Sequence, residues 1–405
     1  MSAEPTEWPI DEAAAYDGYE SYSYLRGGID VEPFAFDPDV DRVDRYPLGL
    51  DPDQRERLRR IFAENTVISL HDHPLRHPAD LGEELAYVKS GRQVTGYRAL
   101  ARSGLTAVFD NLLGGTGPLF SMAGWKYEEV VYDLGMRLAD LAHQSYAVHA
   151  RTVADIAQAK ADGRLAMIFG VESATPIENE LDRIDVLYGL GIRQLGIAYS
   201  ESNLLGSGLT EPVDGGLTRF GHRAVERMNA VGMSIDISHS SDRTCLGAIA
   251  ASSAPLFITH AGARTVWPIA RMKPDEVIVA CAEAGGVIGI SAAPHTTASL
   301  EHPTHTIESI MDHFRYCVDL VGIEHVTFGP DTVFGDHVGL HRAFSKALSN
   351  SAASGPPHEI VPYVAGMENP GENFVNIVAW LIRHDYSEQE IAAVVGGNVL
   401  PVLEA

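Results

Sequence analysis

The chain has little lysine, few cysteines and no long apolar run, and each shortage excludes a class of protein. Only five of its 30 basic residues are lysine, whereas 55 residues are acidic, which gives a formal net charge of −25. Because nucleic-acid binding requires clustered basic side chains, we do not expect nucleic acid as a partner. No run of about 18 apolar residues occurs, so we expect no membrane span and no membrane partner.

The three cysteines, Cys245, Cys281 and Cys317, lie far apart in segments that read as helical. This distribution fits buried free thiols in a reducing compartment better than a disulfide framework. The first residues also lack the basic stretch and apolar run of a signal peptide. We therefore expect a cytoplasmic location.

After residue 65, short apolar runs alternate with amphipathic segments, a pattern typical of an α/β fold with a parallel sheet. Eight such runs predict a (β/α)8 TIM-type barrel with C-terminal helices, as one domain over residues 51–405. Residues 1–50 are acidic and tyrosine-rich, and we expect an arm that packs on the body or is partly disordered. The predicted strands are Thr66–His71, Leu105–Phe109, Leu165–Val171, Ile192–Ala198, Met233–Ser238, Leu256–Thr259, Gly286–Ser291 and His325–Phe328.

The sequence also predicts three helices, two of them from their end signals, and one long loop. A long loop over the barrel mouth is expected from Phe334 to Asn369, which includes Ser-Gly-Pro-Pro. The predicted helices run from Asp51 to Asn65, from the N-cap Thr218 to Gly232, and from the capping box Ser387–Glu390 to Gly396-Gly397.

The predicted first strand runs into His71, Asp72 and His73. Residues i and i+2 of a strand face the same side, so the two histidines can bind one cation together while Asp72 faces elsewhere. A lone His-x-His is weak evidence. It becomes strong when other strands deliver matching ligands to the same end.

Other predicted strands do end in such ligands, at the end of the barrel where barrel enzymes place their chemistry. Any one of these residues could be structural, and Glu172 could simply pair with an arginine. Four imidazoles and two carboxylates on five strands, however, are the ligand inventory of a two-metal site in which Glu172 bridges both cations. The six residues are His71, His73, Glu172, His239, His260 and Asp331.

Several of these segments resemble a known family. They are Gly170-Val-Glu-Ser, Asp236-Ile-Ser-His-Ser-Ser-Asp, Thr259-His-Ala-Gly-Ala-Arg, Gly285-Gly-Val-Ile-Gly-Ile, Phe328-Gly-Pro-Asp and the C-terminal stretch from Tyr386 to Asn398. Over roughly residues 60 to 400 the chain resembles the membrane (renal) dipeptidase family of zinc metallopeptidases, within the amidohydrolase superfamily.

The resemblance implies two divalent metal ions, above all zinc. His71, His73 and Glu172 would hold one ion, and Glu172, His239 and His260 the second. Asp331, at the same metal site, would be the catalytic acid/base. Arg271 would grip a terminal carboxylate of the substrate, unless it forms a salt bridge on the barrel rim, and Tyr199 and Asn203 would complete the substrate contacts.

The chain departs from the family pattern at two positions. His73 stands where the family has aspartate, which keeps a zinc-compatible ligand set and makes the site about one charge unit more positive. Tyr199 stands where the family has a histidine that contacts the scissile carbonyl. A tyrosine hydroxyl can donate a similar hydrogen bond but carries no positive charge.

Three functions follow as hypotheses. The leading one is a binuclear zinc hydrolase that cleaves the amide bond of a dipeptide or related small carboxylated amide. The alternatives are an amidohydrolase for a cyclic amide, lactone or N-acyl compound, which Tyr199 favours, and a non-catalytic, metal-stabilised binding protein. Related barrels commonly form homodimers, although no stretch of this sequence marks an interface.

Overall fold

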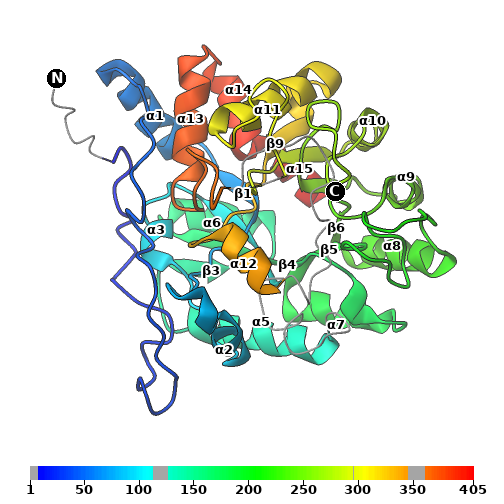
Figure 1. The fold of residues 1–405 in the computed structure, drawn as a ribbon, viewed down its shortest axis with the longest axis horizontal. Helices are drawn as coiled ribbons and strands as arrows, with labels where there is room; N and C mark the ends of the chain where they lie inside the picture. The colour runs from blue at the N-terminus through cyan, green and yellow to red at the C-terminus, as the bar shows by residue number, and fades with distance from the viewer. Residues whose placement is uncertain (1–7, 113–125, 295, 345–360) are drawn as a thin grey trace.

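The structure is a computed structural model that describes residues 8–112, 126–294, 296–344 and 361–405. Eight parallel strands follow one another in the order β1-β2-β4-β5-β6-β7-β8-β9, and β3 pairs with the first three residues of β4. The strands surround a common centre and the helices lie outside them, as in a TIM-type barrel (Figure 1). The strands, with β3 included, are β1 Ile68–Asp72, β2 Ala107–Asn111, β3 Ala147–His149, β4 Leu165–Val171, β5 Ile192–Gly196, β6 Ser234–Asp236, β7 Phe257–Ala261, β8 Val287–Ile290 and β9 Val326–Phe328.

The predicted barrel is confirmed, because each of the eight predicted strands overlaps one strand of the ring. β4 shows why the prediction works: all seven of its residues are buried, as expected of a parallel strand covered on both faces. The short strand β3 was missed. It has only three residues, and two of them are partly exposed, so no buried run marks it in the sequence.

Backbone hydrogen bonds join the C-terminal end of β1 to the residues that follow β9, the last strand. The Asp331 N–H donates to the His71 carbonyl at 2.9 Å, and the His73 N–H donates to the Thr332 carbonyl at 3.0 Å. The ends of β1 and β9 are therefore tied together where the candidate ligands lie.

Helices connect successive strands, and three of them carry the free, buried thiols that the sequence predicts: Cys245, Cys281 and Cys317. No helix in the described parts of the chain is both long and apolar enough to cross a membrane. The helices are α1 Pro52–Glu64, α2 Glu84–Lys89, α3 Tyr97–Leu100, α5 Tyr127–Leu141, α6 Val153–Ala161, α7 Asp182–Leu190, α8 Arg219–Val231, α9 Asp242–Ala251, α10 Asp275–Glu283, α11 Ile307–Val321, α12 His337–Phe344, α13 Asn373–Arg383, α14 Glu388–Ala392 and α15 Val399–Glu404.

The predicted helix starts are confirmed. The Asp51 side chain accepts a hydrogen bond from the Gln54 N–H at the start of α1, and Thr218 caps α8 in the same way. Ser387 forms the expected capping box at the start of α14.

The helix end predicted at Gly396-Gly397 is confirmed. A π-helical turn over Ala393–Gly397 follows α14, and the backbone of Gly396 within it is not helical, which makes a kink before α15 begins. Gly396 also allows close packing, because a Cβ there would lie 2.4 Å from the Thr66 carbonyl oxygen.

The loop predicted from Phe334 to Asn369 contains helix α12, so that prediction is wrong in part. The Ser-Gly-Pro-Pro stretch of this loop lies outside the described residues. The chain becomes irregular again from residue 361 until α13 begins.

The N-terminal arm packs on the body over its described part, residues 8–50. It runs along one flank of the barrel, beside α3 and α2 (Figure 1). The Tyr19 hydroxyl and the Tyr22 N–H both donate to the buried Asp140 carboxylate at 2.7 Å. The Trp8 indole N–H donates to the Arg102 carbonyl at 2.8 Å. Specific hydrogen bonds therefore fix the arm in place.

Candidate metal centre

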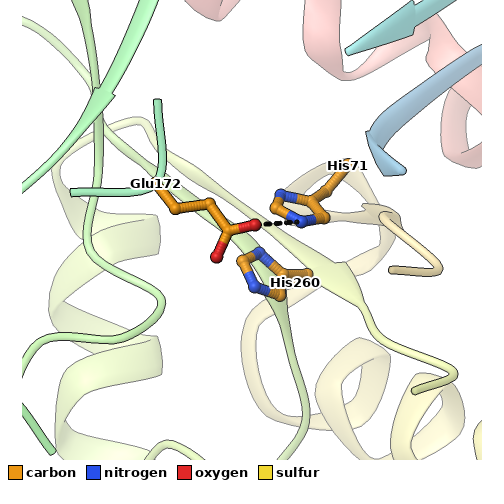
Figure 2. A group of neighbouring side chains, drawn as sticks. All are labelled: His71, Glu172 and His260. Carbon is orange, nitrogen blue, oxygen red and sulfur yellow. Dashed lines mark ion pairs between the residues drawn. The ribbon is translucent and has the colours of Figure 1, made fainter. Parts of the chain in front are cut away.

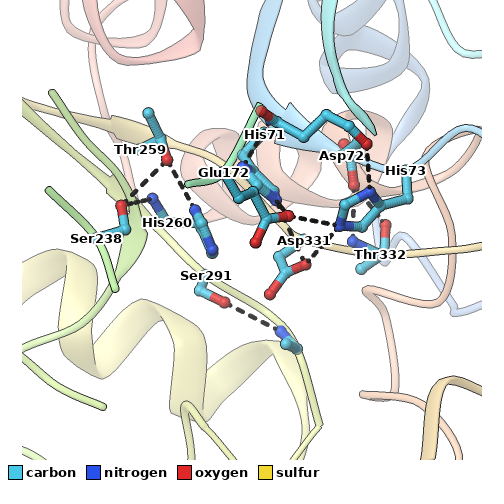
Figure 3. Close-up of polar contacts among 12 residues, drawn as sticks. His71, Asp72, His73, Glu172, Ser238, Thr259, His260, Ser291, Asp331 and Thr332 are labelled. Carbon is cyan, nitrogen blue, oxygen red and sulfur yellow. Dashed lines mark hydrogen bonds and ion pairs between the residues drawn. The ribbon is translucent and has the colours of Figure 1, made fainter. Parts of the chain in front are cut away.

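All six predicted ligands meet at the C-terminal end of the barrel. β1 supplies His71 and leads into His73, and β7 supplies His260. The other three, Glu172, His239 and Asp331, follow β4, β6 and β9. Figure 3 shows Glu172 and Asp331 beside the first three, and His239 lies against Glu172 and His260. Fold geometry explains the convergence, because parallel strands place their carboxyl ends on the same rim.

Glu172 lies at the centre of the cluster. Its Oε1 lies 3.1 Å from Nε2 of His71 and 3.2 Å from Nε2 of His73. Its Oε2 lies 3.5 Å from Nε2 of His239. The two carboxylate oxygens thus face histidines on opposite sides, as a bridging ligand would.

The remaining ligands complete the two sides. Asp331 Oδ1 lies 3.4 Å from Nε2 of His73 and 3.6 Å from Nε2 of His71. On the other side, the Nε2 atoms of His239 and His260 are 2.9 Å apart. The two sides touch, since the ligand atoms of His71, Glu172 and His260 all lie within 4.8 Å of one another (Figure 2).

These residues fit a divalent metal. Within the described part of the chain, Nε2 of His71 and Oε1 of Glu172 are buried without a hydrogen bond of good geometry. Buried polar atoms normally have such a partner, and those that lack one require an explanation. Imidazole nitrogens with carboxylate oxygens are also the donor set that zinc accepts.

A group of supporting side chains was missed by the sequence reasoning. The side-chain amide nitrogen of Asn111 lies 2.9 Å from Nδ1 of His71, and the backbone carbonyl oxygen of Asn111 lies 3.2 Å from Nδ1 of His73. Thr259 Oγ1 lies 2.7 Å from Nδ1 of His260. The strand-end rule could have found Asn111, but the predicted second strand stopped at Phe109, two residues short of the end of β2.

Asp72 faces away from the cluster, as its position between the two histidines predicts. Its carboxylate accepts a hydrogen bond from the Ser69 hydroxyl. It also accepts hydrogen bonds from Thr332, beside which it lies in Figure 3. The other side of β1 therefore carries a polar contact of its own.

The electrostatics of the clustered side chains divide the four imidazoles into two pairs. Burial lowers the pKa of His71, but Glu172 and Asp331 outweigh it and raise that pKa to about 9. The pKa of His73 is raised for the same reasons. Burial, helped by Arg271 and neighbouring imidazoles, instead holds the pKa of His239 and His260 well below the usual range. Binding of a metal ion to His71 and His73 must therefore release protons.

Arg271 lies beside the second pair of histidines, and its guanidinium is buried. It donates to the backbone carbonyls of His260 at 2.7 Å and Ser238 at 3.2 Å, and it approaches Nε2 of His239 at 3.4 Å. These contacts hold a permanent positive charge against the cluster.

The two remaining predicted residues differ in their placement. The Tyr199 ring stacks on the His239 ring, with 3.9 Å between the centroids. The Asn203 amide, in contrast, is used within its own loop: it donates to the Ile197 carbonyl at 2.7 Å and accepts from the Leu205 N–H at 2.8 Å. Tyr199 is thus part of the cluster's surroundings, whereas a substrate contact by Asn203 stays a prediction.

Fold and cluster together define a TIM-type barrel with a candidate metal centre at the C-terminal ends of its strands. The sequence model of the membrane dipeptidase family, peptidase family M19, matches residues 127–342, which is more than half of the chain. The chain belongs to this family.

Individual relatives agree with this assignment. The chain is 29% identical to dipeptidase verJ of Clonostachys rogersoniana over 258 residues, which cover 63% of this chain and 59% of that protein. It is 26% identical to dipeptidase tcpJ of Claviceps purpurea over 251 residues, or 62% of this chain and 53% of that protein. The match thus spans between half and three fifths of these curated relatives.

Solved structures share the fold. An amidohydrolase from Pseudomonas aeruginosa aligns over 85% of this chain and 97% of its own, with a TM-score of 0.70 and 23% identity. A metallopeptidase from Rhodobacter sphaeroides, liganded with a phosphinate mimic of the dipeptide L-Ala-D-Ala, aligns over 84% of this chain and 99% of its own, with a TM-score of 0.64 and 20% identity.

Proposed function

We propose that the protein is a binuclear zinc hydrolase that cleaves the amide bond of a dipeptide or a related small carboxylated amide. The observation that supports this most directly is the position of Glu172, whose two oxygens face His71 and His73 on one side and His239 on the other. Membership of a dipeptidase family supports the same reaction class.

In this proposal His71, His73 and Glu172 hold one cation, and Glu172, His239 and His260 hold the other. When bound, the cations supply Lewis-acid polarisation of the amide carbonyl and lower the pKa of a water molecule in the site. The protein's task is to place the groups that move protons and bind charge around this centre.

Asp331 is the proton carrier in this mechanism. Its carboxylate lies within 3.6 Å of both His71 and His73, so it borders the place where water and substrate meet. Burial alone would raise its pKa, but the neighbouring histidines outweigh burial and hold that pKa well below the usual range. Asp331 is therefore ionised, and it can accept the proton of water and pass it to the leaving nitrogen.

Tyr199 and Arg271 bind the substrate in the same proposal. Burial, followed by the nearby charges of Glu172 and Asp331, raises the pKa of Tyr199 well above its usual range, so its hydroxyl keeps its proton and can donate to a developing oxyanion. The Arg271 guanidinium, held by two carbonyls beside His239, provides the positive charge for a substrate carboxylate.

The hydrolysis of a cyclic amide, lactone or N-acyl compound is a second candidate, favoured by one observation. Tyr199 packs against a buried apolar cluster made of Tyr87, Val88, Val333 and Leu340. This apolar cluster lies beside Tyr199, and residue 199 carries no positive charge. Such surroundings suit an acyl chain or ring of the substrate better than a second charged group of the substrate.

The test is a substrate screen of zinc-loaded protein, with protein treated with chelator and then reloaded as the control. Metal-dependent turnover of L,L- or L,D-dipeptides supports the leading proposal. Turnover of N-acyl, cyclic-amide or lactone substrates alone supports the second candidate and rejects the first. A protein that binds zinc but hydrolyses no member of the panel would contradict both and indicate a binding protein.

A further inference from the structure

Asp331 has an unusual backbone conformation for the residue that would carry the proton. Its φ is +59°, in the left-handed region that non-glycine residues adopt rarely. Aspartate tolerates this region better than most residues, but the conformation still persists only when its surroundings enforce it. The contacts around Asp331 show what enforces it.

The backbone on both sides of the Asp331 side chain is fixed to β1. The Asp331 N–H donates to the His71 carbonyl at 2.9 Å, and the Thr332 carbonyl accepts from the His73 N–H at 3.0 Å. These two bonds fix the position of the backbone at Asp331 and Thr332. They do not fix the orientation of the peptide group between Asp331 and Thr332, which depends on the contacts of the Thr332 N–H and the Thr332 hydroxyl.

Asp72 binds both of these groups. Its Oδ1 accepts from the Thr332 N–H at 2.9 Å and from the Thr332 hydroxyl at 2.7 Å, while its Oδ2 accepts from the Ser69 hydroxyl at 2.5 Å. The Asp72 carboxylate is fully buried, and Figure 3 shows it joined to Thr332. Because Asp72 stands between the two histidines in the strand, its side chain leaves the opposite face of β1. Hydrogen bonds to an ionised acceptor are stronger than those between neutral groups.

The Thr332 hydroxyl also connects this contact to the body of the protein. It accepts a hydrogen bond from the Asn373 side chain at 2.7 Å, at the buried start of α13. The hydroxyl thus donates to one buried group and accepts from another, which leaves it little rotational freedom.

From this geometry we propose that Asp72 and Thr332 are positioning residues: they hold the Asp331 backbone in its left-handed conformation, so that its carboxylate is aimed at His71 and His73. The proposal rests on the proposed function, in which Asp331 is the proton carrier. It gives Asp72 a role distinct from that of its two neighbours, because Asp72 acts on the site from the far side of the strand.

The predicted consequence is a loss of turnover without a loss of binding. A displacement of about 1 Å in a reacting group can reduce a rate about 100-fold. Thr332→Val keeps the side-chain shape but removes the hydroxyl that Asp72 and Asn373 share. We therefore expect kcat to fall about 10- to 100-fold, while KM and the metal content of the protein stay unchanged.

Two further variants separate positioning from general stability. Thr332→Ser keeps the hydroxyl and should restore kcat. Thr327→Val is the matched control, because Thr327 is a buried threonine of β9, the strand that leads to Thr332, and its hydroxyl donates to the Val394 carbonyl at 2.8 Å, away from the cluster. It should reduce stability without reducing kcat. Should Thr332→Val fold poorly, Asp72→Asn keeps one acceptor oxygen and should give an intermediate kcat.

A second readout does not depend on turnover. The visible absorption of cobalt-loaded protein reports the geometry around the metal, and Asp331 borders the metal ligands. We expect the spectrum to change in Thr332→Val and to match the wild type in Thr332→Ser and Thr327→Val.

The positioning role is overturned if Thr332→Val keeps the wild-type kcat and spectrum, or if Thr327→Val changes both as much as Thr332→Val does. A wild-type protein that hydrolyses no substrate contradicts the proposed function instead, and the cobalt spectra then still decide the positioning role.

Discussion

Thr259 Oγ1 lies 2.7 Å from Nδ1 of His260, and this contact determines which ring nitrogen faces the metal centre. Because the pKa of His260 is held low by burial, the ring is neutral and carries one proton. When the Nδ1–H group of His260 donates a hydrogen bond to Thr259 Oγ1, the single ring proton is on Nδ1. Nε2 then carries a lone pair that can bind a metal. Thr259 in turn contacts Ser238 at 3.1 Å, and Ser238 donates to the buried Asp236 carboxylate at 2.6 Å.

Removal of the Thr259 hydroxyl should therefore weaken metal binding. We expect Thr259→Val to lower zinc affinity by about 10- to 100-fold, the usual effect of losing a hydrogen bond to a metal ligand. Thr259→Ser is the control, since it keeps the hydroxyl. Competition with a chelating indicator measures both affinities, and equal affinities for Thr259→Val and the wild type would show that the contact does not orient His260.

Asp331→Asn tests the proton carrier. Asparagine is nearly isosteric but cannot accept a proton from water, so kcat for amide substrates should fall by about 100- to 10,000-fold, the range of general acid–base catalysis. The metal content should stay near that of the wild type, because the four histidines and Glu172 remain. Steady-state kinetics with metal analysis of the same sample checks this, and near-normal turnover would remove Asp331 from the mechanism.

His313 should make stability dependent on pH. Burial lowers the pKa of this α11 residue from 6.5 to about 4; its Nδ1 accepts from the Ala263 N–H, and its Nε2 donates to the Ala298 carbonyl. Between these two pKa values the unfolded chain binds the proton and the folded protein does not. The contribution of His313 to the free energy of unfolding is therefore complete above pH 6.5. It decreases by up to about 3 kcal/mol as the pH falls toward 4.

The measurement is the free energy of unfolding by urea at several pH values between 4 and 7. The wild type should lose stability faster than His313→Gln as the pH falls, whatever the absolute stability of the variant. Parallel curves for the two proteins would show that His313 does not supply this dependence.

The sequence predicts much of the fold and the six clustered side chains because both follow from local patterns. Buried parallel strands are continuous apolar runs, and their polar ends fall on one rim, which brings residues as distant as His71 and Asp331 together. Asn111 was missed only because the end of its strand was placed too early.

Other features depend on partners that the sequence cannot pair. The carboxylate of Asp72 and the hydroxyl of Thr332 are 260 positions apart in the sequence. Neither residue lies in a sequence pattern that predicts the other as its partner. The same holds for the arm, where Tyr19 finds Asp140 across 121 positions. Strand β3, with three residues, is too short to show a buried run.

The most direct test of the central claim is the number of zinc ions that one chain binds, measured by metal analysis after dialysis against trace zinc. The wild type should hold two ions per chain, and His260→Ala should lose one of them, because His260 lies on only one side of Glu172. A wild-type chain without zinc, or a His260→Ala chain that still holds two ions with unchanged affinity, would contradict the account.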